Sequence, residues 1–138
     1  RPSPGVLESI NRSEGIIVCP SNPIVSIGPI LSVGDVRKTL TARRSKVVAI
    51  SPIVGGLPIK GPADKMMHGL GVEVSALGVA QLYSDIASHI VIDEVDENLK
   101  GQIESLGMKA KVANTIMKTM RDKIALSKTV LSILGIRR

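Results

Sequence analysis

Residues 16–31 read IIVCPSNPIVSIGPIL, and this stretch decides the class of fold. Its four opening apolar residues are typical of a strand that is buried on both faces of a parallel sheet. A turn follows in which Ser21 or Asn22 can cap a helix, and Pro23 suits the first helical position because no N–H is needed there. A buried strand that runs through a capped turn into a helix predicts an α/β protein.

The same alternation of strand and helix repeats along the chain. Residues 47–50 and 90–92 are continuous apolar runs that predict two more strands, and residues 109–113 predict a weaker one. Between the strands lie expected helices at about 23–42, 62–70, 76–88, 96–106 and 116–134. Strands that alternate with helices favour parallel pairing through right-handed crossovers. We therefore expect a Rossmann-like three-layer α/β fold with a mostly parallel sheet.

Composition limits the class of protein. The 138 residues suit one domain, with residues 15–138 as its α/β part and residues 1–14 as a tail or a cut linker. We find no apolar stretch of about 18 residues that would span a membrane. A single cysteine rules out an internal disulfide or a cysteine-based zinc site, and a reducing cytoplasm is the expected setting. One Tyr is the only aromatic residue, so the chain lacks the stacking platforms of proteins that bind single-stranded nucleic acid.

Ligands of open α/β sheets bind beyond the carboxyl ends of the strands, so the residues after each strand are the candidates for a site. After the first strand, Ser21, Asn22 and Pro23 begin a helix, and Ser26 lies one turn further on. Free N–H groups and the dipole at a helix start favour an anion, most often a phosphate. The alternative is a helix cap that binds no ligand.

The second strand leads into a loop of about ten residues, which exceeds the usual length of roughly 2–6 for such connections. Gly55 and Gly56 let the backbone approach a ligand closely, and Lys60 supplies a positive charge for a phosphate. Asp64 follows in the next expected helix. The alternative is a stiff connection in which Gly and Pro only set the path of the chain.

The third strand ends at Asp93, where a carboxylate can bind Mg²⁺ or a ribose hydroxyl. We expect Asp96 and Glu97, by contrast, to serve only the start of the next helix, as a cap and as a favourable charge on its dipole. The two histidines form no cluster, and the sequence holds no metal-ligand spacing and no Ser-His-Asp arrangement.

Five motifs in order along the chain resemble the C-terminal half of the 2-phospho-L-lactate transferase family. They are CPSNPIVSIGPIL, VVAISPIVGG, KGPADKMM, LGVEVSALGVAQLY and VIDEVD. The resemblance runs from about Gly15 to about Asp96 and continues more loosely to the end of the chain.

The resemblance implies a transferase of deazaflavin coenzyme F-420 biosynthesis. Such an enzyme uses Mg²⁺ to move a 2-phospholactyl group, or a related three-carbon group, from lactyl-2-diphospho-5'-guanosine to the deazaflavin precursor Fo, and GMP leaves. The residues expected near the guanosine diphosphate are Ser21, Asn22, Pro23, Ser26, Gly55 and Gly56. Lys60 is then expected to face the phosphates, and Asp64 and Asp93 to orient a loop or the metal. Phosphoryl transfer asks mainly for positioning and charge neutralisation, which such residues supply.

Chains of this family are about twice as long, so the resemblance also implies a partial domain that lacks the N-terminal half. We expect this chain to be inactive alone. We also expect it to form a homo-oligomer or to pair with the missing half, because bare apolar surface favours association.

Two other functions stay open. One is a regulatory protein of the same fold that binds a nucleotide or nucleotide-sugar without catalysis, which a preference for uridine over guanosine nucleotides would favour. The other is an interaction module, because residues 100–138 hold nine basic and two acidic side chains, a net charge of +7. The basic face at 116–134 is typical of a solvated surface helix, so we expect no nucleic-acid partner.

Overall fold

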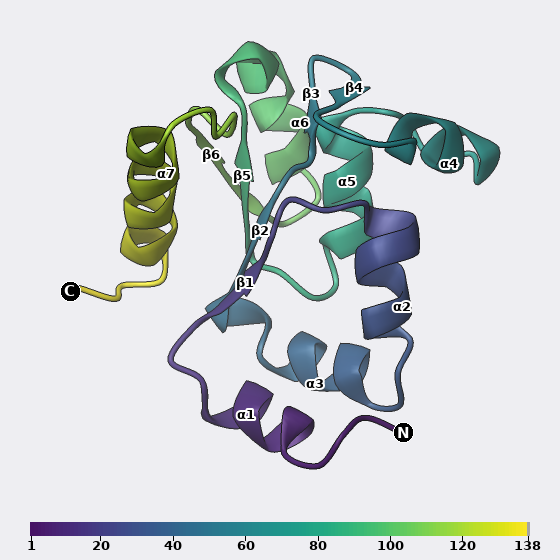
Figure 1. The fold of residues 1–138 in the computed structure, drawn as a ribbon, viewed down its shortest axis with the longest axis vertical. Helices are drawn as coiled ribbons and strands as arrows, with labels where there is room; N and C mark the ends of the chain where they lie inside the picture. Colours follow the sequence, from purple (N-terminus) through teal and green to yellow (C-terminus); the bar gives the residue numbers. More distant parts are fainter. Residues whose placement is uncertain (138) are drawn as a thin grey trace.

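The computed structural model describes residues 1–137 and has a central sheet between two helical layers (Figure 1). The strands of the sheet are β1 (Ile16–Val18), β2 (Val47–Ile50), β5 (His89–Ile92) and β6 (Lys109–Val112), and a hairpin of β3 (Ile53–Val54) and β4 (Leu57–Pro58) is separate. The helices are α1 (Val6–Arg12), α2 (Gly28–Leu31), α3 (Val36–Ala42), α4 (Ala63–Gly69), α5 (Ala76–Tyr83), α6 (Lys100–Glu104) and α7 (Met120–Ile133). Helical segments of other types are the π-helix η1 (Pro23–Ile27) and the 3-10 helices η2 (Arg44–Lys46) and η3 (Glu94–Leu99). No helix in this range is long and apolar enough to cross a bilayer.

The strands of the sheet are all parallel and lie in the order β1-β2-β5-β6. The register places Val18 opposite Ala49 and Ile50 opposite Val91. The carboxyl ends of the strands therefore meet at one edge of the sheet, which is the upper edge in Figure 1. The prediction of an α/β fold with a mostly parallel sheet is confirmed.

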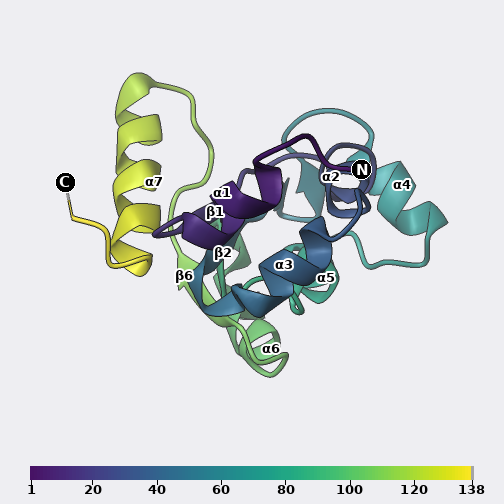
Figure 2. The same cartoon turned by 90° about the horizontal axis from the view of Figure 1, so that it is seen from below.

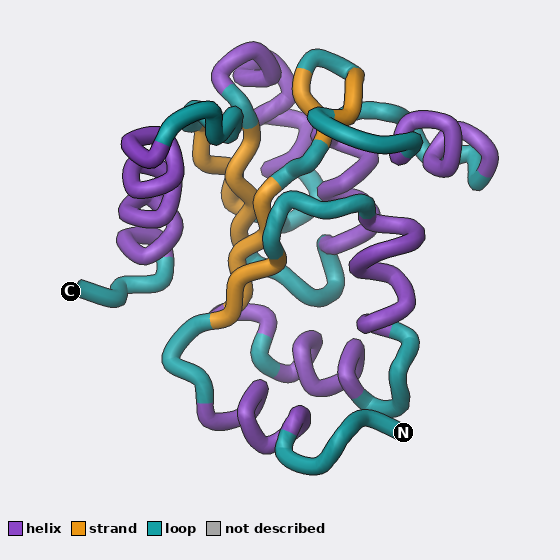
Figure 3. The backbone as a smooth tube through the Cα atoms, viewed as in Figure 1, coloured by secondary structure: helices purple, strands orange, loops and turns teal. Residues whose placement is uncertain are grey.

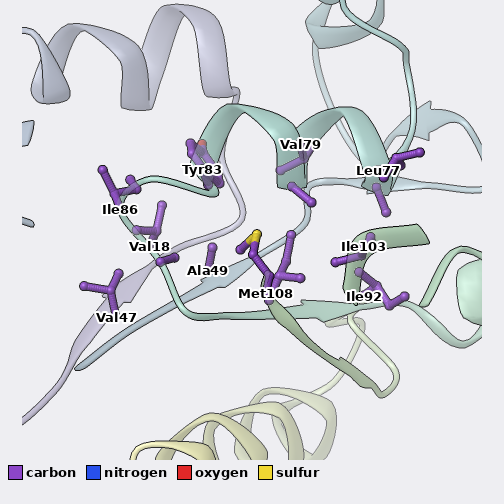
Figure 4. Close-up of a cluster of buried hydrophobic side chains, with 14 of the residues drawn as sticks. Val18, Val47, Ala49, Leu77, Val79, Tyr83, Ile86, Ile92, Ile103 and Met108 are labelled. Atoms are coloured by element: carbon purple, nitrogen blue, oxygen red, sulfur yellow. The ribbon is translucent and has the colours of Figure 1, made fainter. Parts of the chain in front are cut away.

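Alternate residues of each strand face opposite helical layers. Val18, Ala49 and Ile92 join the main core, where Tyr83 of α5 and Ile103 of α6 cover them (Figure 4). Because the chain has no Phe or Trp, this core consists mainly of branched aliphatic side chains, with Met and Ala in the remaining spaces. Full burial of a Val, Ile or Leu contributes about 1.5–3 kcal/mol, so such a core can stabilise the sheet without large aromatic residues.

Helix α7 covers the other face of the sheet. Its Leu126 and Val130 pack against Val48, Ile50 and Val91. Figure 2 shows α7 standing apart from the other α-helices, which lie on the opposite side of the sheet. The arrangement is therefore helix, sheet and helix, the expected three layers.

A capping box explains why α7 begins at residue 120 rather than at 116. The hydroxyl of Thr119 accepts a hydrogen bond from the amide of Asp122 at 3.2 Å. In return, the carboxylate of Asp122 accepts one from the amide of Thr119 at 2.7 Å. Reciprocal bonds of this kind satisfy amides that a helix start leaves without a partner.

Two expected helices are broken into shorter elements. The segment at 23–42 forms η1, α2 and α3, because the chain turns at Gly34, which has a positive φ of 50°. A left-handed residue cannot continue an α-helix, and glycine adopts that conformation at low cost. The segment at 96–106 begins as the 3-10 helix η3 and becomes α-helical only from residue 100.

Residues 1–14, expected as a tail or a linker, contain α1 instead. This helix packs on α3, as the purple segments at the bottom of Figure 3 show. Its Leu7 and Ile10 pack against the main core, so their apolar surface contributes to the fold. Two apolar residues three positions apart are the sequence signal for this helix.

Candidate functional site

A cleft of about 530 Å³ lies at the carboxyl edge of the sheet. Its walls come from the segments after β1, β2 and β6. The residues that line it are Pro20–Asn22, Val25, Ser26, Pro52, Ile59–Ala63, Thr115 and Met117. Of the residues proposed from the sequence, the structure thus brings Ser21, Asn22, Ser26 and Lys60 to one place. This location is where α/β proteins of open-sheet architecture bind ligands.

Asn22 caps the helical segment on the first wall of the cleft. Its Oδ1 accepts hydrogen bonds from the amides of Ile24 at 2.9 Å and Val25 at 3.2 Å. Pro23 is the buried first residue of the helix and has no N–H to offer. The first-turn amides that an anion would need therefore already have a partner in the cap. This geometry supports the alternative interpretation, a helix cap that binds no anion through its backbone amides.

The other end of the Asn22 side chain is available to a ligand. Its Nδ2 makes one long contact, 3.5 Å to the sulfur of Met66, and sulfur is a weak acceptor. The hydroxyls of Ser21 and Ser26 lie on the same wall. This wall therefore supplies neutral hydrogen-bonding side chains.

Lys60 is the only charged residue among those that line the cleft, and its side chain is exposed. No lining residue is acidic, so the local charge is positive. A lysine ammonium is a compact point charge that suits a phosphate or another anion. The cleft thus combines one cation with neutral polar groups and apolar walls.

Gly55 and Gly56 form the turn of the β3–β4 hairpin and do not line the cleft. Both have positive φ, 59° and 77°, and they join Val54 to its partner Leu57. A two-residue hairpin turn of this type needs φ above zero at both positions, which explains the glycine pair. Their positive φ serves the turn, and the close approach to a ligand that we expect of them stays a prediction.

A buried carboxylate holds this turn in place. Asp96 is 5% exposed, and its two oxygens accept hydrogen bonds from the amide of Gly55 at 3.1 and 3.2 Å. The expectation that Asp96 serves only the helix start is therefore wrong, because its side chain reaches 41 residues back along the chain. The residue that caps η3 is Asp93, whose Oδ1 accepts from the amide of Val95 at 3.2 Å.

Asp64 also lies outside the cleft. It lines a separate shallow hollow with Gly56, Lys65, His68 and Val74. It is an acidic residue in the first turn of α4, where a negative charge interacts favourably with the helix dipole.

Asp93 does not fit a magnesium ligand in this arrangement. It is 4% exposed, and its Oδ2 accepts from the amide of Thr115 at 2.9 Å and from the hydroxyl of Thr115 at 3.0 Å. Mg²⁺ prefers six oxygen ligands and keeps several waters, which a buried carboxylate with three protein donors does not accommodate. Within residues 1–137 no group of three or more His, Cys, Asp or Glu side chains could hold a metal ion.

Sequence reasoning missed Thr115 and Met117, which form the wall of the cleft after β6. Residues 109–113 gave only a weak strand signal, because Lys109 and Lys111 interrupt the apolar run. Applying the carboxyl-end rule to that fourth strand as well would have found both residues.

The fold and the cleft together define an α/β protein with a candidate ligand site at the carboxyl edge of a parallel sheet. The chain belongs to the family described as 2-phospho-L-lactate transferase CofD, whose profile matches residues 1–130.

Curated relatives support this membership. The chain is 44% identical over 131 residues to the 2-phospho-L-lactate transferase of Methanothermobacter thermautotrophicus, a match that covers 95% of this chain and 42% of the relative. It is 40% identical to the protein of that name from Methanosarcina barkeri and 41% identical to that from Methanocaldococcus jannaschii, covering 95% and 98% of this chain and 42% of each relative. The chain thus spans about two fifths of the relatives' length, and the match falls in their C-terminal part.

Proposed function

We propose that this chain forms the donor-binding part of a transferase that moves a 2-phospholactyl, or related three-carbon, group in a cytoplasmic setting. The donor is lactyl-2-diphospho-5'-guanosine, and the acceptor is the deazaflavin precursor Fo. The observation that carries the proposal is the convergence of Ser21, Asn22, Ser26 and Lys60 on one cleft at the carboxyl edge of the sheet. Membership of the 2-phospho-L-lactate transferase family supports the same chemistry.

The proposed reaction is a substitution at phosphorus. An acceptor hydroxyl oxygen forms a bond to the phosphorus that carries the lactyl group, and the bond from that phosphorus to the bridging oxygen breaks. The bridging oxygen leaves with GMP, and the hydroxyl proton is released. Such transfers depend on positioning and charge neutralisation more than on covalent help from the protein.

The residues of the cleft suit the binding half of this task. Lys60 would neutralise negative charge on the diphosphate, and the Nδ2 of Asn22 would donate to one of its oxygens. Ser21 and Ser26 would donate from the same wall. The chain spans about two fifths of the length of its relatives, so we expect the chain alone to be inactive.

Magnesium belongs to the proposal for a whole transferase. The carboxylate of Asp93 already accepts hydrogen bonds from Val95 and Thr115, so we derive no step of the reaction from a metal held by this chain. Diphosphate oxygens are themselves good ligands for Mg²⁺.

A calorimetric titration of this chain with GDP and with UDP, each with and without Mg²⁺, tests the proposal. We expect saturable binding that favours GDP. A preference for UDP would support the non-catalytic nucleotide or nucleotide-sugar binding protein instead. If neither nucleotide bound, the donor site would not lie in this chain.

The variant Asn22→Asp separates ligand binding from helix capping. Aspartate keeps an oxygen that can accept from Ile24 and Val25, so the thermal midpoint should change little. It replaces the Nδ2 donor with a negative charge, so the affinity for GDP should fall roughly tenfold or more. Unchanged GDP affinity in this variant would remove Asn22 from the donor site.

A further inference from the structure

A second cavity, of about 650 Å³, lies at the edge of the sheet opposite to the cleft, and we call it the amino-end cavity. Its walls come from three segments that are far apart in the sequence. The residues that line it are Ser13 and Glu14 before β1, Arg43 and Lys46 before β2, and Leu134–Arg137 after α7. These segments meet at the amino ends of β1 and β2, which form the lower edge of the sheet in Figure 1. The amino-end cavity therefore shares no lining residue with the cleft.

The chain after α7 turns back to form one wall of this cavity. The amide of Ile136 donates to the carbonyl of Leu131 at 2.9 Å, across Gly135, which has a positive φ of 71°. This bond is typical of a Schellman motif, which ends a helix and reverses the chain. Gly15 packs so closely on the turn that a Cβ atom at this position would lie 2.7 Å from a methyl group of Leu134. Two walls of the cavity are therefore fixed against each other.

Arg43 fixes the third wall. One Nη of its guanidinium donates to the carbonyl of Ser13, which joins the segment before β2 to the segment before β1. The Nε of Arg43 is buried and has no hydrogen-bond partner among the described residues. The guanidinium is thus held in place while part of its capacity to donate remains unused within this part of the chain.

The charge of the cavity is positive. Arg43, Lys46 and Arg137 line it together with a single carboxylate, that of Glu14. Within residues 1–137, no carboxylate forms an ion pair with any of the three cations. Like charges that line one cavity repel one another, and a bound anion offsets that repulsion. Lys46 and Arg137 are exposed, so their side chains are free to move onto such a ligand.

We propose that the amino-end cavity binds a phosphate group, either as inorganic phosphate or as part of a small organic molecule. Arginine donates directed hydrogen bonds to phosphate oxygens, and lysine adds a point charge. The volume of the cavity lies within the usual range of roughly 300–1,000 Å³ for small-molecule sites, so an organic part has room as well. The proposal is independent of nucleotide binding in the cleft, because the two sites lie at opposite edges of the sheet.

A titration followed by NMR tests this proposal. The ¹⁵N-labelled chain is titrated with sodium phosphate, with sodium chloride of equal ionic strength as the reference, because added salt alone weakens surface electrostatics. We expect saturable shifts of the amides of Glu14 and Gly135–Arg137 and of the Nε–H of Arg43. Lys60→Gln should leave these shifts unchanged, since Lys60 lines the cleft instead.

Glycerol 3-phosphate distinguishes the two sources of the phosphate group. If it binds more tightly than inorganic phosphate at the same amides, the organic part contributes and the ligand is a phosphorylated small molecule. If it binds equally or more weakly, the ligand is inorganic phosphate. Either result supports a phosphate site, and the absence of both shifts would overturn it.

A matched pair of double variants locates the site. Lys46→Gln/Arg137→Gln removes two of the three cations and keeps the bond from Arg43 to Ser13, so the affinity for phosphate should fall roughly tenfold or more. Lys100→Gln/Lys111→Gln removes two exposed cations outside this cavity, and the affinity should change little. Circular dichroism shows whether each double variant keeps the fold.

Two results would overturn the proposal. One is a response to phosphate that does not saturate or that chloride reproduces. The other is an equal loss of affinity in the two double variants, which would indicate only a general effect of net charge. The cations that follow α3 and α7 would then serve only the negative ends of these helix dipoles. Binding of GDP in the cleft should be the same in the parent chain and in Lys46→Gln/Arg137→Gln, so the two proposals fail separately.

Discussion

The Oδ2 atom of Asp93 accepts two hydrogen bonds from Thr115, one from its amide at 2.9 Å and one from its hydroxyl at 3.0 Å. Both residues are buried, at 4% and 0% exposed. The pair joins the carboxyl end of β5 to the loop after β6, and that loop places Met117 in the wall of the cleft. One side of the candidate site is therefore fixed by a buried polar contact between neighbouring strand ends.

Replacing Asp93 tests this structural role against the role of a metal ligand. Asp93→Asn exchanges one acceptor oxygen for an NH₂ group and leaves a buried donor of Thr115 without a partner, so we expect a loss of about 1–3 kcal/mol of stability. Urea denaturation without metal measures it. Thr115→Val removes only the hydroxyl bond and should cost less. If Asp93→Asn left metal-free stability unchanged but altered Mg²⁺ binding, Asp93 would be a metal ligand after all.

A similar clamp fixes the hairpin that leads to Lys60. Both oxygens of Asp96 accept from the amide of Gly55. In Asp96→Asn one of the two oxygens is lost, so the Gly55 amide should exchange faster with deuterium and the stability should fall by about 1 kcal/mol or more. Asp64→Asn is the matched control on α4, and it should leave the exchange of Gly55 unchanged. Equal exchange in all three proteins would mean that the hairpin needs no clamp.

Residue patterns predicted much of this fold. Each of the apolar runs at residues 16, 47 and 90 became a strand of one parallel sheet. A run without alternation is typical of a strand covered on both faces, as β2 and β5 are, whereas Ile17 of the edge strand β1 is 41% exposed. The start of α7 was predicted wrongly. Thr119 and Asp122 form a capping box that is visible in the sequence, but the expected start at residue 116 was based on the apolar pattern instead.

The candidate site was harder to predict than the fold. Ser21 and Lys60 could be placed at one cleft from the sequence, because the topology alone brings the residues that follow parallel strands to the same edge of the sheet. The bond from Asp96 to Gly55 spans 41 residues, and Asp96 carries no mark in the sequence that separates it from the neighbouring acids. Contacts of this kind depend on the loop path, which turn residues limit but do not determine.

Lys60 is expected to contribute to nucleotide affinity and not to stability. Its ammonium lines the cleft and is exposed. Lys60→Gln should weaken GDP binding roughly tenfold, because one charge-assisted contact to phosphate is lost. Its thermal midpoint should match that of the parent chain. Lys65→Gln, an exposed lysine on α4 outside the cleft, is the charge-matched control, and an equal loss of affinity in it would indicate only a general effect of net charge.

The single aromatic residue gives a prediction on stability. Tyr83 is 2% exposed, and its hydroxyl is buried without a hydrogen-bond partner in the described residues. Burial also raises the pKa of that hydroxyl, although the charge of Arg37 acts in the opposite direction. Tyr83→Phe removes an unsatisfied polar atom, so the chain should keep its stability or gain up to about 1 kcal/mol. A loss above about 1 kcal/mol in urea denaturation would show that the hydroxyl has a partner in solution.

Histidine 89 should make the fold less stable in mild acid. Partial burial lowers the pKa of His89 below its usual 6.5, and the positive charges of Lys109 and Arg44 act in the same direction. The unfolded chain therefore binds a proton more readily than the folded chain, so this contribution to stability is present above pH 6.5 and is lost as the pH falls through the folded pKa. Urea denaturation at about pH 7.5 and about pH 5.5 measures the difference. His89→Gln should reduce that difference and His68→Gln, on the exposed end of α4, should not. An equal difference in all three proteins would assign the pH dependence to other groups.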